Sequence, residues 1–358
     1  MLFLVTLISG AGYGGIQAVN KLIIDVAENA AQPGCVVSWH DAPGVAWARR
    51  WPDAICAGGS RLRFVLGALA RLRHARGSLI FATHVGLAPL GRIIKHISKG
   101  RLLIFLHGVE AWGPIPRITM WGLKGCDLFV TNSQYTLTEF RAQHPMVSEI
   151  PGEVCHLPAR SLGNGHGHLQ ERNDNPAGHR VLIVGRIWGR GLMKGQRELI
   201  SVWPRVLECF PQAELWIVGE GAGRSQLESL AKSLGVDGAV KFTGQVPDVE
   251  LEAIYRASDL YAMPSRGEGF GLVFAEAMAV GLPCIASKLD AGSEVVVNGE
   301  TGILVDPANL DELFQAIKEL LGDKDLRARM GQAGLRRATE IFSLDNFNQR
   351  IERLLNGE

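Results

Sequence analysis

The sequence predicts an α/β protein made of two doubly wound domains, each with a parallel sheet. The chain has 358 residues, and at roughly 100 to 200 residues per domain this length favours two domains. Short apolar runs recur at spacings that leave room for a helix between them, as buried parallel strands require. A segment rich in turn-forming residues, 158–178, separates two such series. Because ligands bind beyond the carboxyl ends of the strands in such sheets, we expect the site in a cleft between the domains.

The composition excludes several other classes of protein. Apolar residues make up 47% of the chain, which excludes a disordered chain, and the 43 glycines show no three-residue period, which excludes collagen. The formal net charge is +1, so we expect no nucleic-acid partner. The six cysteines include no Cys-x-x-Cys pair, so we expect reduced, mostly buried thiols in a cytoplasmic protein.

The first domain is predicted over residues 1–160. The opening MLFLVTLIS lacks a basic leader and is too short to span a bilayer, so we expect a buried strand there rather than a signal peptide. The predicted strands of this domain are Leu2 to Ser9, Val36 to Trp39, Leu79 to Ala82, Leu102 to Leu106 and Leu128 to Thr131.

A linker is predicted at 161–178 and a second domain at 179–340. Its predicted strands are Val181 to Val184, Leu215 to Val218, Val240 to Thr243, Leu260 to Met263, Cys284 to Ala286 and Ile303 to Val305. Helices such as Leu227 to Leu234 and Leu310 to Leu321 follow strands. The closing segment, 341–358, places Phe342, Leu344, Phe347, Ile351 and Leu354 at helical spacing.

The most informative motif is PSRGEGFGLVFAEAMA, residues 264–279. It follows a predicted strand, and its glycines let the backbone approach a ligand closely before a helix from about Leu272. Glu268 lies in the turn and Glu276 lies in the helix. Backbone N–H groups at the start of a helix can bind a phosphate, and carboxylates can accept hydrogen bonds from sugar hydroxyls.

Glu268 and Glu276, with seven residues between them, resemble the Glu-x7-Glu signature of the family-4 retaining glycosyltransferases, which have the GT-B fold. Further similar segments follow the same order: VGR at 184–186, KG at 194–195, LWIVGEG at 215–221, FTGQV at 242–246, then Glu294 and NGETGILVDP. In the first half the similarity is carried by Gly14-Gly15 and by LHGVE at 106–110. The resemblance implies two Rossmann-like domains that face a central cleft, and a last helix that crosses back to the first domain.

The resemblance also implies roles for individual residues. Arg186 and Lys194 would bind the donor diphosphate, and fixed cations there would stabilise the leaving group more in the transition state than in the ground state. Glu268 would bind hydroxyls of the transferred sugar, Glu276 the ribose, and His107 the donor sugar near its anomeric centre. The residues implied in catalysis are Glu268, His107, Lys194 and Arg186. Those implied in donor binding are Gly14, Gly15, Arg186, Lys194, Phe270, Gly271, Leu272 and Glu276.

Three features depart from the family pattern. Arg186 and Lys194 are separated by IWGRGLM, so Arg190 could replace either of them. Asp290-Ala291 stands where a double glycine usually precedes Glu294. The first-half signature is short, so no acceptor contacts carry over.

No metal and no covalent nucleophile are expected. In this family the departing phosphate is thought to help deprotonate the acceptor hydroxyl on the same face of the sugar. The one Asp-x-Asp, Asp323 to Asp325, is predicted to lie on a solvated turn. His166 and His168 have metal-binding spacing, but they lie in a glycine-rich loop without carboxylates.

The predicted function is therefore metal-independent, retaining transfer of a sugar from a UDP- or GDP-sugar to a hydroxyl of a saccharide or lipid-linked acceptor. We expect this activity in cell-surface polysaccharide or glycolipid synthesis. One alternative is an NAD(P)-dependent oxidoreductase, because Gly10, Gly12 and Gly15 fit G-x-G-x-x-G and Asp41 ends the second strand. Another is a non-catalytic protein that retains the fold.

Charge is distributed unevenly along the chain. Residues 1–160 hold 16 Lys and Arg against 9 Asp and Glu, a formal charge of +7, and the remainder carries −6. The segment 60–78 is basic, with an apolar stripe at helical spacing: Leu62, Val65, Leu66, Leu69 and Leu72. The segment could lie on an anionic membrane at the inner face of the plasma membrane, or its stripe could pack on the first sheet with the arginines in water; we expect a combination, because packing and surface attraction use different faces.

Overall fold

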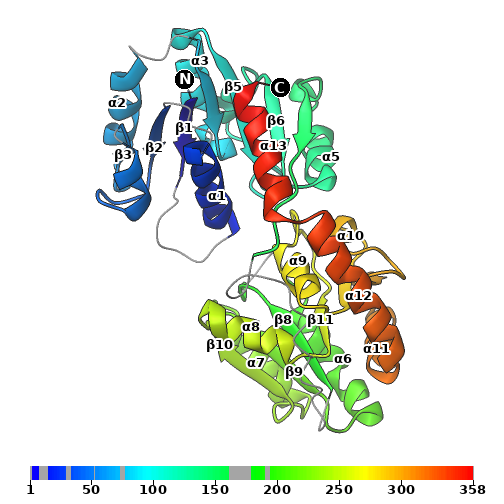
Figure 1. Ribbon diagram of the computed structural model, residues 1–358. Helices are drawn as coiled ribbons and strands as arrows, with labels where there is room; N and C mark the ends of the chain where they lie inside the picture. The colour runs from blue at the N-terminus through cyan, green and yellow to red at the C-terminus, as the bar shows by residue number, and fades with distance from the viewer. Residues whose placement is uncertain are drawn as a thin grey trace. The chain divides into compact units, whose positions relative to one another are not determined.

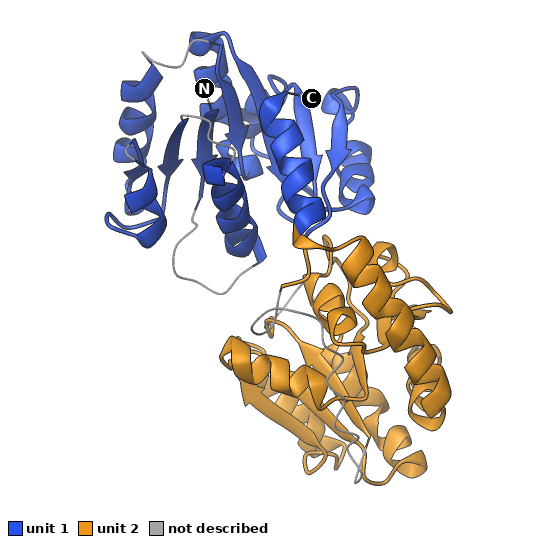
Figure 2. Cartoon of the chain, in the orientation of Figure 1, with its two compact units in different colours: residues 1–157, 345–358 blue, residues 158–344 orange. Residues whose placement is uncertain are grey.

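The computed structural model describes residues 2–7, 15–29, 34–51, 53–72, 77–160, 179–189 and 194–357. The chain divides into two compact units (Figure 1 and Figure 2). Unit 1 is Met1–Leu157 with Asp345–Glu358, and unit 2 is Pro158–Leu344. Each unit holds one sheet whose described strand pairs are all parallel. The predicted fold class, two doubly wound α/β domains, is confirmed.

Unit 1 contains a seven-stranded sheet in the order β3-β2-β1-β4-β5-β6-β7. Its strands are β1 (Leu2–Thr6), β2 (Gly34–Ser38), β3 (Ile55–Cys56), β4 (Leu79–Ala82), β5 (Arg101–Leu106), β6 (Leu128–Thr131) and β7 (Gly152–Val154). The five predicted strands are all present. The two that were not predicted, β3 and β7, are short edge strands without an apolar run. The strand order reverses at β1, which pairs with both β2 and β4.

Helices cover the sheet of unit 1. They are α1 (Gly15–Asn29), α2 (Arg61–Arg71), α3 (Ala88–Ser98), α4 (Arg117–Leu123), α5 (Gln134–Gln143) and, from Asp345 on, α13 (Leu344–Asn356). The described residues of this unit also include the short 3-10 helices η1 (Ala46–Arg50), η3 (Val85–Leu87) and η4 (Pro145–Val147). The closing helix α13 buries Phe347, Ile351 and Leu354 within unit 1, as predicted, whereas Leu344 is exposed.

The α2 helix buries a different face from the one that the apolar stripe predicts. Phe64 and Ala68 are its buried residues, and a Cβ on Gly67 would lie 2.8 Å from Ile55 Cγ2. The stripe itself is largely exposed: Leu62 69%, Val65 38%, Leu66 55% and Leu69 36%. The interpretation that it packs on the sheet is therefore wrong for these four residues, and Leu72 is the one that packs partly against the core.

Unit 2 contains a six-stranded sheet in the order β10-β9-β8-β11-β12-β13. Its strands are β8 (Arg180–Val184), β9 (Glu214–Val218), β10 (Val240–Gly244), β11 (Leu260–Met263), β12 (Cys284–Ser287) and β13 (Gly302–Val305). Its helices are α6 (Gln196–Cys209), α7 (Arg224–Ser233), α8 (Asp248–Arg256), α9 (Leu272–Ala279), α10 (Gly292–Val295), α11 (Leu310–Gly322) and α12 (Lys324–Glu340). All six predicted strands are present, and the order reverses at β8, between β9 and β11.

Several predicted features lie outside the described residues. They are the linker 161–178 with His166 and His168, the first glycine loop with Gly10, Gly12 and Gly14, and Arg190. In the described ranges, no helix is long and apolar enough to cross a membrane. The Asp-x-Asp motif has a structural role, because Asp323 caps α12 by accepting a hydrogen bond from Leu326 N at 2.8 Å.

Candidate active site

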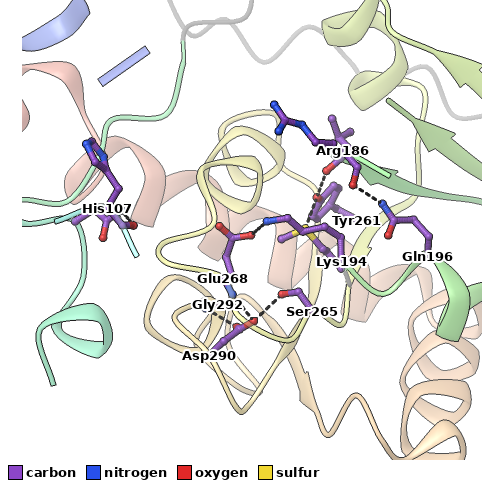
Figure 3. Close-up of polar contacts among 12 residues, drawn as sticks. His107, Arg186, Lys194, Gln196, Tyr261, Ser265, Glu268, Asp290 and Gly292 are labelled. Atoms are coloured by element: carbon purple, nitrogen blue, oxygen red, sulfur yellow. Dashed lines mark hydrogen bonds and ion pairs between the residues drawn. The ribbon is translucent and has the colours of Figure 1, made fainter. Parts of the chain in front are cut away.

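The predicted donor-binding residues of unit 2 gather at the point where its strand order reverses. Arg186 follows β8, and Lys194 lies just before α6. Glu268 lies in the loop from β11 to α9. Since β8 and β11 are parallel neighbours, their carboxyl ends meet at one edge of the sheet, which is where doubly wound sheets bind ligands. Figure 3 shows these side chains together with the loop that follows β12.

Lys194 and Glu268 form an ion pair at this edge: Lys194 Nζ donates a hydrogen bond to Glu268 Oε2. The two side chains are 24% and 15% exposed, so the pair is largely screened from water. Gly195 brings the start of α6 to this position. Its φ is +95°, and a Cβ on it would lie 2.6 Å from Pro264 Cδ, so glycine is required there. A positive charge and a carboxylate are thus held side by side at the strand ends.

Asp290 organises the loop that carries Glu268. Its side chain is fully buried, and its Oδ2 accepts hydrogen bonds from Ser265 Oγ at 2.7 Å and from Glu268 N at 3.0 Å. Its Oδ1 accepts one from Gly292 N at 3.0 Å. Burial raises the pKa of Asp290 to about 6. No local pattern in the sequence indicates this role for Asp290, which stands where the family pattern has a glycine.

Glu276 lies on α9 and is fully buried. Its Oε1 accepts a hydrogen bond from Arg160 Nε at 2.5 Å, and its Oε2 accepts one from the Tyr255 hydroxyl at 3.0 Å. Burial raises the pKa of Tyr255 well above its usual value, so the phenol stays protonated and donates. Neither Arg160 nor Tyr255 was predicted, because contacts this distant in sequence leave no local pattern.

The loop between the two glutamates has the conformation that its glycines suggest. Gly271 precedes α9 with a φ of +92°, and a Cβ there would lie 2.5 Å from Phe274 Cδ2. Phe270 is buried edge-on against Phe342, with ring centroids 5.6 Å apart. Leu272 begins α9, so the loop places the positive end of a helix dipole at the candidate site.

Arg186 lies on the surface near the end of β8. Its guanidinium stacks over the ring of Trp188, 5.0 Å from the ring centroid, and Figure 3 shows it pointing away from the Lys194–Glu268 pair. The main-chain oxygen of Arg186 accepts a hydrogen bond from Gln196 Nε2 at 3.4 Å. Arg186 is thus near the strand ends, but its guanidinium is paired with the Trp188 ring rather than with the Lys194–Glu268 pair.

His107, at the end of β5 in unit 1, is buried and neutral. Burial lowers its pKa to about 4. Its Nε2 lies 2.8 Å from Thr83 O, and because a carbonyl only accepts hydrogen bonds, Nε2 carries the proton and Nδ1 is an acceptor. The main-chain N of His107 donates to Glu110 Oε1 at 2.6 Å. Burial also lowers the pKa of the neighbouring His84 to about 4.

The first glycine loop is described only from Gly15 on. Gly15 is the first residue of α1, and a Cβ on it would meet no atom of the described residues within 4 Å, so the packing that the structure describes does not itself require glycine there. Asp41, which the oxidoreductase interpretation needs for a ribose, is buried and accepts a hydrogen bond from Ser38 Oγ at 2.6 Å.

Comparison with known proteins identifies relatives over most of the chain. The profile of the family described as "Glycosyl transferases group 1" matches residues 170–337. A GDP-mannose-dependent alpha-(1-6)-phosphatidylinositol monomannoside mannosyltransferase of Mycobacterium tuberculosis is 31% identical over 286 residues, which are 76% of this chain and 73% of that protein. Its namesake from Mycolicibacterium smegmatis is 29% identical over 315 residues, 83% of this chain and 80% of that protein.

Two solved structures share the fold. Sucrose-phosphate synthase from Thermosynechococcus elongatus superposes with a TM-score of 0.81 at 21% identity, covering 99% of this chain and 98% of that one. HepE from Anabaena, in complex with UDP, superposes with a TM-score of 0.78 at 23% identity over the full length of both chains. The fold and the relatives together show that the chain belongs to the group 1 glycosyl transferases, enzymes of the family-4 type with the GT-B fold.

Proposed function

We propose that this glycosyltransferase moves a mannosyl group from GDP-mannose to a hydroxyl of a lipid-linked saccharide, with retention of anomeric configuration and without a metal. The observation that carries the proposal is the Lys194–Glu268 pair at the strand reversal of unit 2. The oxidoreductase and non-catalytic alternatives are set aside, because the chain belongs to a family of glycosyltransferases.

The choice of donor rests on the relatives that cover most of the chain. The mycobacterial relatives are named GDP-mannose-dependent phosphatidylinositol monomannoside mannosyltransferases, and one from Corynebacterium glutamicum, 27% identical over 326 residues, has a closely similar name. HepE was solved with UDP, but at 23% identity it shows the fold alone. GDP-mannose is therefore the first donor to test, with UDP-glucose as the comparison.

The first chemical requirement of the site is to stabilise the negative charge that develops on the leaving diphosphate. As the bond between the sugar C1 and the β-phosphate oxygen breaks, the diphosphate gains negative charge, which Lys194 and the start of α9 would stabilise. Glu268 would accept hydrogen bonds from hydroxyls of the sugar once Lys194 turns to the phosphate. The acceptor oxygen bonds to C1 on the face that the phosphate leaves, and its proton passes to the departing phosphate oxygen. In this proposal Lys194 and the start of α9 supply the positive charge that a metal ion would otherwise provide.

The anionic membrane surface is the second part of the proposal. The exposed apolar stripe of α2, Leu62, Val65, Leu66 and Leu69, is flanked by the exposed Arg61 and Arg63. The neighbouring helix α3, which α2 contacts, exposes Ile93 and Ile97 at 39% and 52%. No acidic residue lies between Asp53 and Glu110. Exposed apolar side chains among arginines favour binding of this face to an anionic bilayer. Such binding would bring the enzyme to a lipid-linked acceptor.

The activity test uses purified protein with octyl α-mannoside as acceptor, GDP-mannose or UDP-glucose as donor, and EDTA throughout. We expect release of GDP and an α-linked product, identified by NMR of its anomeric proton. A β-linked product would contradict retention, and a requirement for added Mg²⁺ or Mn²⁺ would contradict metal independence. Transfer from UDP-glucose alone would contradict the choice of donor while leaving the site in place.

A further inference from the structure

The carboxylate of Glu276 is closed off in this structure. Both of its oxygens accept a hydrogen bond, one from Arg160 and one from Tyr255, and its side chain is 0% exposed. A carboxylate can accept more than two hydrogen bonds, but hydroxyls of a ligand must first reach it. Atoms that cover the carboxylate therefore have to move before a sugar or ribose hydroxyl can bind to Glu276, and its two hydrogen-bond partners lie against it.

Arg160 is the partner that can move. Tyr255 is fully buried on α8, with its ring 6.0 Å from that of Tyr261. The Arg160 side chain, by contrast, is 37% exposed. A second carboxylate is also within reach, because Arg160 Nη1 lies 3.5 Å from Asp248 Oδ1, and the Asp248 side chain is 64% exposed. Turning toward Asp248 would keep the guanidinium paired after it leaves Glu276.

The backbone on the N-terminal side of Arg160 is held by a hydrogen bond, so the side chain is the part that we expect to move. Ala159 N donates a hydrogen bond to Phe342 O at 2.8 Å, and Phe342 is buried against Phe270 of the candidate donor loop. The segment that enters unit 2 at Pro158 is thereby held beside the loop and α9. The Arg160 side chain therefore reaches Glu276 from a segment whose preceding residue is hydrogen-bonded within unit 2.

We propose that Arg160 is an inhibitory lid on Glu276, which the ribose of the donor must displace in order to bind. This inference rests on the proposed function, in which Glu276 binds the ribose of a nucleoside diphosphate sugar. Arg160 and the ribose hydroxyls compete for one carboxylate, so the apparent dissociation constant for the nucleotide equals the intrinsic one divided by the fraction of molecules with the lid open. Removing Arg160 should therefore tighten nucleotide binding.

The test compares GDP with 2′,3′-dideoxy-GDP, which lacks the hydroxyls that need Glu276. Binding is measured by isothermal titration calorimetry for the wild type, Arg160→Met and Arg160→Gln. We expect both variants to bind GDP at least about fivefold more tightly than the wild type does, since fivefold is the lower end of the usual coupling between two sites. Both variants should bind dideoxy-GDP with a dissociation constant within about twofold of that of the wild type. Arg160→Gln keeps a neutral donor near Glu276, in case Arg160→Met does not fold.

A matched control is Arg205→Met, which removes a surface ion pair of the same unit, with Arg205 Nη1 2.5 Å from Asp311 Oδ1. We expect no change in binding of either nucleotide. Weaker GDP binding by the Arg160 variants would overturn the lid, because it would mean that Arg160 supports the bound ribose. An equal gain for both nucleotides would overturn it as well. If the wild type bound neither GDP nor UDP, the proposed function itself would fail, and the lid with it.

Discussion

The buried carboxylate of Asp290 accepts a hydrogen bond from the main-chain N–H of Glu268 at 3.0 Å. The contact joins the loop after β12 to the loop after β11, so the backbone of Glu268 is held from the neighbouring strand end. Ala291 N strengthens this link by donating to Glu268 O at 3.1 Å. Asp290 therefore helps to position the ion pair between Lys194 and Glu268. It does so through the main chain of Glu268 rather than through the charged groups of the pair.

Asp290 should impose a pH dependence on stability. Its pKa is raised by burial to about 6 from an ordinary value of 3.8, so between these pH values the folded protein holds a proton that the unfolded chain has released. Its contribution to stability is therefore full below pH 3.8 and is lost as the pH rises through 6. We expect the free energy of unfolding of the wild type, relative to Asp290→Asn, to fall by about 2 kcal/mol from pH 4.5 to 7. Urea denaturation at these two pH values measures it, and a constant difference would contradict the buried, raised pKa.

Lys194 and Glu268 should be necessary for transfer but not for folding. The variants Lys194→Ala and Glu268→Gln each remove one preorganised polar contact, so we expect turnover to fall by on the order of 10²- to 10³-fold. Circular dichroism spectra should be unchanged, because both side chains lie in loops beyond the strand ends rather than in the core. Lys318→Ala, on an exposed position of α11, is the matched control and should transfer at the wild-type rate. Turnover within threefold of the wild type in both site variants would exclude this pair from the active site.

His107 should remain neutral well below the usual pH of histidine titration. Burial lowers its pKa to about 4, and the carbonyl of Thr83 fixes its proton on Nε2. Because the folded pKa lies below the unfolded value, the stability linked to His107 is present above pH 6.5 and is lost as the pH falls toward 4. Nitrogen-15 NMR of the imidazole should show the Nε2–H tautomer at pH 6. A titration midpoint near pH 6.5 would mean that the ring is not buried as described.

The membrane proposal predicts that the exposed apolar stripe of α2 is required for binding to anionic vesicles. The double variant Leu62→Ser, Leu66→Ser removes two leucines that are 69% and 55% exposed, so its stability should change little. Fully burying a leucine is worth about 1.5–3 kcal/mol, so we expect at least a tenfold loss of binding to phosphatidylglycerol vesicles.

Control variants separate this face from other exposed parts of the chain. Val249→Ser, at an 80% exposed position of unit 2, should bind vesicles like the wild type. Arg71 is a poor choice for testing the charge of this face, because its Nη1 lies 3.1 Å from Asp53 Oδ1. Arg61 and Arg63 are exposed and more suitable. Equal binding of the double variant and the wild type would contradict a role for α2.

Much of the fold could be predicted because buried parallel strands leave a local signal. Runs such as Leu79–Ala82 and Leu260–Met263 match the observed β4 and β11 residue for residue. The edge strands β3 and β7 have no such signal, because an edge strand needs fewer apolar residues. The helical period was correct for α2, but two apolar stripes overlap on it. The sequence does not tell which stripe is buried, and the structure buries the one with Phe64 and Ala68.

The candidate site likewise contains residues that could be predicted from the sequence and residues that could not. Glu268, Glu276 and Lys194 could be predicted because they stand in a recognisable order around glycine turns. Arg160, Tyr255 and Asp290 could not, since their roles come from contacts across 116, 21 and 22 positions of the chain. Such contacts depend on the strand order, which brings β8, β11 and β12 side by side. No local sequence pattern indicates that order.

The most direct test of the account is the thermal stability of the purified protein with GDP, UDP, ADP or NAD, in the presence of EDTA, for the wild type and Lys194→Ala. Binding to the native state raises Tm, by an amount that grows with the ratio of ligand concentration to Kd. A nucleoside diphosphate site held by Lys194 predicts an EDTA-insensitive rise with GDP in the wild type and little or none in the variant. A rise with NAD alone, or an equal rise with GDP in both proteins, would contradict it.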